Sequence, residues 1–413
     1  MAYLPVALIL AGMTAYTVLA GADFGAGLWT LLAVGRSASA RRLRDEARHA
    51  MGPVWEANHV WLIFVLVIAW TAYPVAYGSI TSTLAAPLLI AAIGIIFRGA
   101  AYALRGALDS SRFAEYLFAL SSVLTPFALG TAVGAIAVGR VPVGNAAGNP
   151  VTSWLNPACV LIGALAVVFS GYLAAVYLAA DSLRHGRREL APAFRRRALL
   201  AGVVCGALAL AGLLVMRRSG LNLTHGVALG LVCVSAVAGL ATLLLCWWYR
   251  FGLARVTAAL AVAAVVVGWA AGQAPRLLPG MTVAQAAASR STLIALTIAV
   301  CCGAVVLVPS LGLLFTLYLR GRLGTPEDTA GVSGVSGVSG VSGVSAVGDG
   351  GAGVGARAVR TRVRAWAISA AAGLVAGTGL LVFADAGWAH VAGVVCLVGC
   401  AVAVFALAAP GDV

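Results

Sequence analysis

Long uninterrupted apolar runs dominate this 413-residue chain. Several of them extend for 18 residues or more, and a helix of about 20 residues crosses the roughly 30 Å hydrocarbon core of a bilayer. A transmembrane β-strand would instead show roughly ten residues of alternating polarity. The run at 254–271 has no such alternation. The pattern therefore predicts an all-α polytopic membrane protein.

The apolar runs predict nine core spans, then a polar segment, then two more spans. Their expected ranges are 4–33, 53–71, 79–104, 114–138, 157–180, 198–216, 225–249, 254–271, 292–319, 365–383 and 388–408. The first lacks the basic start of a signal peptide and is expected to be retained.

The polar segment separates two membrane parts. Its repeated Gly-Val-Ser at 331–345 and the Gly/Ala-rich run that follows offer no side chains for a core, which is typical of a flexible linker. We therefore predict a main transmembrane domain at 1–324, a Gly/Val/Ser-rich cytoplasmic linker at 325–364 and a two-helix membrane extension at 365–413.

The placement of arginine indicates the orientation in the membrane. If the N-terminus lies outside, 22 of the 27 basic residues, all of them arginine, fall on the cytoplasmic side. Cytoplasmic loops are enriched in basic residues. The clearest exceptions are Arg217 and Arg218, which we interpret as a helix end whose side chains reach the interface. The chain is thus expected to have an outer N-terminus and a cytoplasmic C-terminus.

Composition narrows the class of protein further. Hydrophobic residues make up 62% of the chain and charged residues 10%, whereas soluble domains carry about 25% charged residues. The net charge is +14, but the sequence has no solvated basic domain of the kind that nucleic-acid binding needs, so a nucleic-acid partner is not expected. The eight cysteines lie in apolar runs without metal-ligand spacing, so we expect buried packing residues and no metal site.

Two carboxylates within apolar spans are the first candidates for function. A buried carboxylate costs about 2.5 to 3.5 kcal/mol on insertion, so it is a functional hypothesis by default. Asp23 lies in the first span among Gly21, Gly25 and Gly27, which allow another helix to approach closely. Glu56 lies in the first turn of the second span, at its cytoplasmic end.

Glu56 belongs to a polar cluster on the second span. His59 shares its helix face at i,i+3, and Asn58 is adjacent. A carboxylate, an imidazole and an amide at the membrane edge suit a proton entrance. The alternatives are that Glu56 only interacts with the positive helix N-terminus and that His59 is an ordinary core residue. Trp55 and Trp61 are then interfacial or packing aromatics.

Arg98 lies inside the third predicted span and needs a partner there. Glu56 and Asp23 are the candidates, because their spans should have adjacent cytoplasmic halves. The alternative is a side chain that extends to the interface. Of the remaining polar residues, Asn156 is expected to cap a helix and Asp181 to mark the end of its span.

Histidines bear on haem binding, because membrane cytochromes hold haem with axial histidine or methionine. His49 and His185 fall in predicted loops, and no two of the five histidines are paired across the bilayer on one span. The chain is therefore not expected to build a multi-haem site or to contain catalytic residues of its own.

Two short motifs resemble those of a known family. Residues 20–25, Ala-Gly-Ala-Asp-Phe-Gly, are similar to an Asp-Gly-Phe-Asp-hydrophobic-Gly signature, with Ala20 in place of its leading Asp. Residues 55–63 match Trp-Asp/Glu-x-Asn-x-x-Trp-Leu-Ile. Further agreement occurs at Tyr73-Pro74, Phe97-Arg98, Asn156-Pro157 and 306–309. Over about residues 1–324, the chain resembles subunit II of cytochrome bd quinol oxidases.

The resemblance implies a fold, a partner and an activity. Subunit II is expected to form two four-helix bundles and a peripheral helix in the bacterial cytoplasmic membrane. It would bind no haem itself and would associate with subunit I, which holds b-type and d-type haems, oxidises quinol and reduces dioxygen. Small accessory membrane subunits, lipid and quinone are further expected partners.

The resemblance also implies roles for individual residues. Glu56 would be the proton-path carboxylate, with Asp23, Asn58 and His59 in the same polar region, while Trp55, Trp61 and Arg98 would give structural support. Ala20 removes the second carboxylate that a relay within the first span would need. Two alternatives remain: a multi-span transporter, since polar residues midway through a bundle also form substrate sites, and a purely structural scaffold subunit.

Overall fold

The structure, a computed structural model, describes residues 2–32, 42, 55–103, 112–184, 186–221 and 223–319, together with residues 372, 392 and 396. The chain separates into two units, Met1–Leu319 and Arg320–Val413. Nearly all of the second unit lies outside the described residues, and so do the predicted linker and the two predicted C-terminal spans. Of residues 55–57, 102–103, 112–117, 305, 307–309 and 311–319, only the backbone is described.

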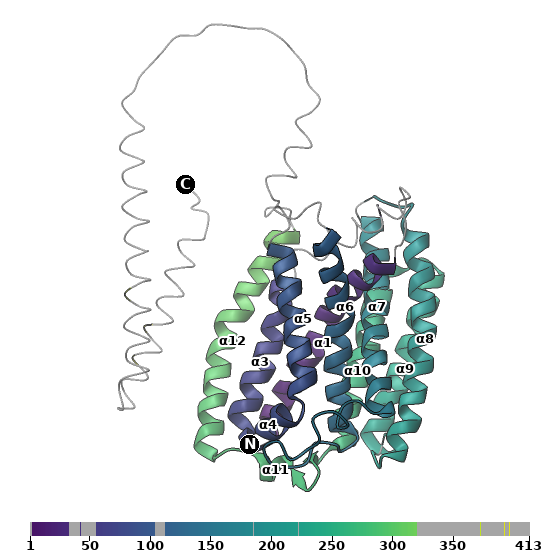
Figure 1. The fold of residues 1–413 in the computed structure, drawn as a ribbon. Helices are drawn as coiled ribbons and strands as arrows, with labels where there is room; N and C mark the ends of the chain where they lie inside the picture. The colour runs from purple at the N-terminus through teal and green to yellow at the C-terminus, as the bar shows by residue number, and fades with distance from the viewer. Residues whose placement is uncertain are drawn as a thin grey trace, which may run out of the picture. The chain divides into compact units, whose positions relative to one another are not determined.

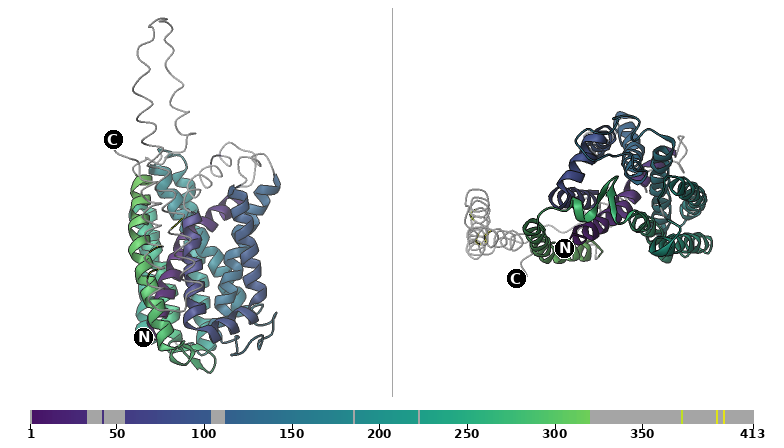
Figure 2. Two further views of the ribbon diagram at one scale, coloured as in Figure 1. Left: turned by 90° about the vertical axis from the view of Figure 1, so that its left-hand side faces the viewer. Right: turned by 90° about the horizontal axis from the view of Figure 1, so that it is seen from below.

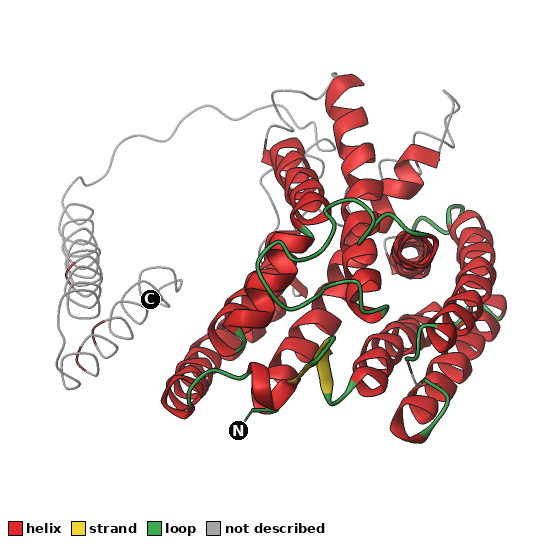
Figure 3. Ribbon diagram, turned by 60° about the horizontal axis from the view of Figure 1, so that its bottom comes forward, coloured by secondary structure: helices red, strands yellow, loops and turns green. Residues whose placement is uncertain are grey.

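Helices make up most of the described residues of the first unit (Figure 1). They are α1 (Leu4–Leu32), α3 (Trp55–Ala72), α4 (Pro74–Thr83), α5 (Ala85–Ala103), α6 (Arg112–Ala137), α7 (Pro157–Arg184), α8 (Ala191–Arg218), α9 (Gly226–Trp247), α10 (Phe251–Gln273), α11 (Val283–Ala286) and α12 (Arg290–Leu319). An antiparallel hairpin of β1 (Arg276–Leu278) and β2 (Met281–Thr282) precedes α11 (Figure 3).

Six helical segments in the described residues are long and apolar enough to cross a membrane: α1, the part of α6 from Phe118 to Ala137, α7, α8, α9 and α10. The bent pair of α4 and α5 is a seventh candidate. Shorter apolar stretches occur in α3, at Asn58–Ala72, and in α12, at Arg290–Ala304. The prediction of an all-helical membrane protein is confirmed, with six to seven candidate spans.

The third predicted span differs from the expected straight helix over 79–104. It is bent by 82° between α4 and α5, with Leu84 between the two helices. Pro87 explains the break, because its ring would clash with the carbonyl of Thr83 four residues earlier in a continuous helix. α4 also begins at a proline, Pro74. A proline disfavours helical backbone in the residue before it, and Tyr73 accordingly has a non-helical backbone.

The loop at 138–156 is fastened to the short helix α4. The backbone N–H of Gly144 donates to Ser79 Oγ over 2.9 Å, and that of Ala146 donates to Ser82 Oγ over 2.8 Å. At the end of this loop the N–H of Cys159 donates to Asn156 Oδ1 over 3.1 Å. Asn156 therefore caps α7, as its position before Pro157 predicts.

The helices of the first unit form two groups in contact (Figure 2). One group contains α1, α3, α5 and α6, and the other contains α7, α8, α9 and α10. α7 is central, because it packs on α1, α6, α8 and α10. α12 lies beside α3.

Small side chains allow α7 to take this central position. Leu173, Ala174, Ala175 and Val176 are fully buried, and the same core contains alanines of α1, α8 and α10. Close approach of small residues is the main source of helix association in lipid, where the hydrophobic effect gives little. The first group has its own apolar cluster around Tyr16, which holds α1 in register with α3, α5 and α6.

Candidate functional site

The most unusual feature of the interior is an ion pair between α1 and α5. The side chains of Asp23 and Arg98 are 1% and 0% exposed. Arg98 Nε donates to Asp23 Oδ2 over 2.8 Å, and Nη2 donates to Oδ1 over 2.7 Å. Nη2 also donates to the backbone oxygen of Asp23 over 2.6 Å. Of the two partners predicted for Arg98, the structure thus shows Asp23. The two side chains meet in the bidentate geometry that makes such ion pairs strong.

The rest of the guanidinium is also enclosed by polar and aromatic groups. Arg98 Nη1 donates to Ser122 Oγ on α6 over 2.7 Å, and Ser122 in turn donates to the carbonyl of Phe118 over 2.6 Å. The guanidinium carbon lies 4.9 Å from the ring centre of Phe24 and 4.4 Å from that of Phe118. Hydrogen bonds and ring faces offset much of the desolvation cost of burying this cation.

Two glycines of α1 allow neighbouring helices to approach closely, as the sequence predicts: Gly27 makes room for the ion pair and Gly25 for α7. A Cβ on Gly27 would lie 1.9 Å from Ser122 Oγ and 3.1 Å from Arg98 Nη1. A Cβ on Gly25 would lie 1.8 Å from the backbone oxygen of Ser170 on α7. Neither separation is possible for a real side chain, so both neighbouring helices approach α1 at positions that only glycine permits.

We expect Gly25→Ala to destabilise the protein, because the Ser170 carbonyl belongs to the backbone of α7 and cannot swing aside. Gly21→Ala is the matched control, since its nearest neighbour is the flexible end of Leu173 at 3.3 Å. Overpacking typically costs about 1 to 3 kcal/mol. Thermal unfolding of the purified protein, monitored by size-exclusion chromatography, should show a lower midpoint for Gly25→Ala and an unchanged midpoint for Gly21→Ala. Equal midpoints for the two variants would contradict the helix contact.

Polar atoms without protein partners lie on the helices around the ion pair. Tyr16 Oη on α1, Asn58 Oδ1 on α3 and Thr125 Oγ1 on α6 are buried and have no hydrogen-bond partner among the described residues. The residues are 8%, 1% and 0% exposed. Buried polar groups that lack protein partners are where ordered water is expected. These three atoms are therefore places in the first helix group where bound water is expected.

Two of these residues, Tyr16 and Thr125, are near the ion pair by their positions on the helices. Tyr16 precedes Asp23 by seven residues, so both lie on one face of α1. Thr125 lies one turn beyond Ser122 on α6, and its Oγ1 would be 2.2 Å from a Cβ on Gly94 of α5. Gly94 is one turn before Arg98 on the same helix, so Thr125 meets α5 next to the guanidinium.

The polar cluster predicted on the second span reaches the same region. The rings of His59 and Tyr16 meet edge to face with centres 6.2 Å apart. Trp61 packs against the apolar cluster formed by Tyr16, Ala20 and Phe24. The structure therefore brings His59 and Trp61 of α3 beside the part of α1 that leads to Asp23, and Asn58 precedes His59 on the same helix.

Glu56 and Trp55 lie in the first turn of α3. Their side chains fall outside the described residues, so their roles remain predictions from the sequence. The helix carries Asn58 and His59 within one turn of Glu56. A carboxylate at the start of α3 would thus be followed along the helix by an amide and an imidazole.

Sequence reasoning missed several residues of the site, among them Ser122, Phe118, Thr125 and Tyr16. Single hydroxyl residues are common inside transmembrane helices, where they bond to their own helix carbonyls, so Ser122 and Thr125 give no distinctive signal. Tyr16 does give a signal in the sequence, because it lies on the same face of the first span as Asp23.

A second ion pair lies at the end of α7. Arg255 Nη2 of α10 is 2.5 Å from Asp181 Oδ2 and donates to the Tyr177 carbonyl over 3.0 Å. Asp181 therefore ties α7 to α10, one turn before α7 ends. Among the described residues, no group of three or more histidine, cysteine or acidic side chains is arranged to hold a metal ion.

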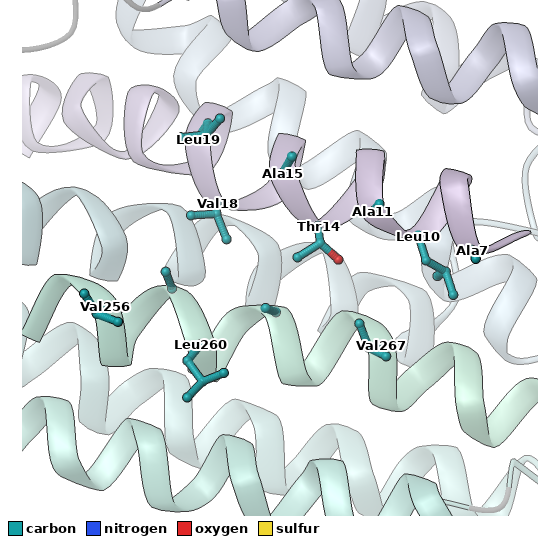
Figure 4. Close-up of a pocket in the computed structure, with 12 residues that line it drawn as sticks. Ala7, Leu10, Ala11, Thr14, Ala15, Val18, Leu19, Val256, Leu260 and Val267 are labelled. Carbon is teal, nitrogen blue, oxygen red and sulfur yellow. The ribbon is translucent and has the colours of Figure 1, made fainter. Parts of the chain in front are cut away.

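An apolar groove of about 810 Å³ lies between α1 and α10 (Figure 4). Its lining includes Leu10, Val18, Val256, Leu260 and Val267, and Thr14 supplies a hydroxyl. The lining residues include no titratable group. The groove is therefore a poor candidate for proton or acid–base chemistry, which leaves the buried ion pair and its neighbours as the candidate site.

Comparisons with known proteins agree with the motifs. Residues 1–318 match the family model described as cytochrome bd terminal oxidase subunit II. A 115-residue stretch is 30% identical to cytochrome bd ubiquinol oxidase subunit 2 of Bacillus subtilis, and covers 27% of this chain and 33% of that protein. The aligned stretch thus spans about a third of the relative's length.

A solved structure shares the fold. It is the bd oxidase from Geobacillus thermodenitrificans, one chain of which superposes with a TM-score of 0.57 and 22% sequence identity. The match covers 77% of this chain and 98% of that one. At this identity the similarity establishes a common arrangement of helices.

Proposed function

The chain belongs to the cytochrome bd terminal oxidase subunit II family, and we propose that it is the haem-free subunit of a quinol:O2 oxidoreductase. Its partner would be a haem-bearing subunit I with b-type and d-type haems, and small accessory membrane subunits are further candidates. Quinol would be the substrate of the complex, and this chain would contribute support and a route for protons.

The proposed architecture has nine core spans in two four-helix bundles with α12 as the peripheral helix. Two C-terminal spans would follow the linker, with domain boundaries at 324 and 364. The complex would lie in the bacterial cytoplasmic membrane with the N-terminus outside. Support comes from the two groups of helices and from the described arginines, eight of which lie at the ends of α7 to α10 opposite the start of α1.

The buried polar region of the first helix group is the observation that supports a proton route. Protons would enter from the cytoplasm at Glu56, pass Asn58 and His59, and reach water held by Tyr16 and Thr125. Asp23 would remain a fixed negative charge, because Arg98 binds both of its carboxylate oxygens. The Arg98 guanidinium neutralises this charge, so the ion pair would shape the polar region without itself carrying the proton.

Purification in mild detergent with a tag on this chain tests the oxidase assignment. We expect a larger haem-containing membrane protein to co-purify, and the reduced-minus-oxidised spectrum to show haem d together with b-type haem. Quinol addition should then cause oxygen consumption. A preparation that contains no haem-bearing partner would exclude the assignment and favour a transporter, for which substrate-dependent flux in vesicles is the direct assay.

A further inference from the structure

Arginine is in large excess at one end of the second helix group. The segments 181–197 and 248–255 carry Arg184, Arg187, Arg188, Arg195, Arg196, Arg197, Arg250 and Arg255. Their acidic residues are Asp181 and Glu189, which pair with Arg255 at 2.5 Å and with Arg42 at 3.9 Å. Within these two segments arginines therefore outnumber carboxylates by eight to two.

Three consecutive aromatic residues stand at the same end, where α9 turns into α10. Trp247, Trp248 and Tyr249 are 62%, 65% and 46% exposed. Tryptophan and tyrosine prefer the headgroup level of a membrane, where a ring meets hydrocarbon and its polar atom meets water. The turn between α9 and α10 therefore marks the depth of the lipid headgroups.

Arg195 of α8 is held against this turn by two carbonyl groups and two rings. Its Nε donates to the carbonyl of Cys246 over 3.1 Å, and its Nη2 donates to that of Trp247 over 3.2 Å. The guanidinium carbon lies 4.8 Å from the ring centre of Trp247 and 4.7 Å from that of Tyr249. A guanidinium has five N–H groups, so three remain for a ligand.

The backbone at Tyr249 explains how its ring reaches Arg195. The N–H of Arg250 donates to the Leu245 carbonyl, and the N–H of Tyr249 donates to the Cys246 carbonyl. These two hydrogen bonds define a Schellman motif at the end of α9. Tyr249 takes the left-handed position of that motif, with φ of 58°. Glycine is the residue that fits there without strain, so the tyrosine ring is present despite an unfavourable backbone.

We propose that this turn binds the phosphate headgroup of an anionic phospholipid. Arg195 would hold the phosphate with its remaining N–H groups, and the exposed side chain of Arg250 would add charge. Trp247, Trp248 and Tyr249 would contact the glycerol and the upper acyl chains. Rings at headgroup depth favour a lipid over free phosphate, because a soluble anion gains nothing from them. The proposal does not depend on oxidase activity.

Native mass spectrometry of the purified complex, reconstituted in nanodiscs of phosphatidylglycerol and phosphatidylcholine, tests the site. The wild-type complex should retain phosphatidylglycerol. Each arginine near an anionic surface contributes enough attraction that losing one should weaken retention about fivefold and losing two about thirtyfold. We therefore expect about fivefold from Arg250→Gln and about thirtyfold from Arg195→Gln/Arg250→Gln. Arg217→Gln/Arg218→Gln is the matched control: it removes the same charge at the other end of α8, away from this turn, and should weaken retention clearly less than Arg195→Gln/Arg250→Gln.

Arg195 also bonds to the end of α9, so the double variant could lose structure. Tyr249→Gly guards against this, because it relieves the backbone while removing a ring: we expect an unchanged or higher unfolding temperature together with weaker phosphatidylglycerol retention. Equal retention by Arg250→Gln, Tyr249→Gly and wild type would overturn the proposal. So would displacement of the lipid by millimolar inorganic phosphate, or loss of a protein partner from these variants with lipid retention intact.

Discussion

Arg98→Gln is expected to lower the stability of the protein more than any other single substitution of a charged side chain among the described residues. It leaves Asp23 as a buried carboxylate without its cation, and breaking one side of a buried ion pair costs about 3 to 5 kcal/mol. Ser122 loses its contact with the guanidinium at the same time. Thermal unfolding and the yield of assembled complex should both fall.

A double-mutant cycle separates the ion pair from general damage to the core. Asp23→Asn with Arg98→Gln removes both charges, and we expect this double variant to be more stable than Arg98→Gln alone. Arg217→Gln provides the control, because that arginine is exposed at the end of α8. Additive losses for Asp23 and Arg98 would show that the two charges do not stabilise one another.

Glu56→Gln is expected to reduce quinol-driven oxygen consumption about a hundredfold, while the haem content of the complex remains normal. Positioned proton-transfer groups typically contribute this much or more, and glutamine keeps the size of the side chain but cannot carry a proton. Oxygen uptake with an excess of reduced quinol is the direct measurement, accompanied by a reduced-minus-oxidised spectrum to show that haem incorporation is unaffected.

Glu56→Asp is the matched control for this experiment. It keeps the carboxylate and shortens it by one methylene, so it should retain most of the oxygen uptake. If the subunit is purely structural, a different result is expected: the complex with Glu56→Gln would consume oxygen and generate a membrane potential like the wild type. Unchanged turnover in an assembled complex would end the proton-path proposal while leaving family membership intact.

The sequence predicts the helices well and their irregularities poorly. Uninterrupted apolar runs define each of the described long helices, because a span in lipid must satisfy its backbone internally. The bend at Leu84 escapes this reasoning, because the residues before it, Ser-Ile-Thr-Ser-Thr at 79–83, are short and uncharged and Pro87 alone signals the break. Prolines are tolerated inside other spans, as Pro126 in α6 shows, so a proline by itself does not predict a bend.

The candidate site could be predicted only in part for a similar reason. Asp23 and Arg98 are recognisable because a charge within an apolar run is rare. Which carboxylate would meet Arg98 depends on how α1, α3 and α5 are arranged, and local pattern carries no information about that. Ser122 and Phe118 escape entirely, because their importance comes from a neighbour on another helix.

The contact between Asp23 and Arg98 also has a consequence for how the chain enters the membrane. An arginine that leaves the translocon in an isolated helix is costly in lipid, and the cost falls once a carboxylate is at hand. Asp23 precedes Arg98 by 75 residues, so α1 is already inserted when α5 emerges from the ribosome. The ion pair therefore favours an order of biogenesis in which α1 is inserted first and α5 packs against it. This contact would form before the helices of the second group have been synthesised.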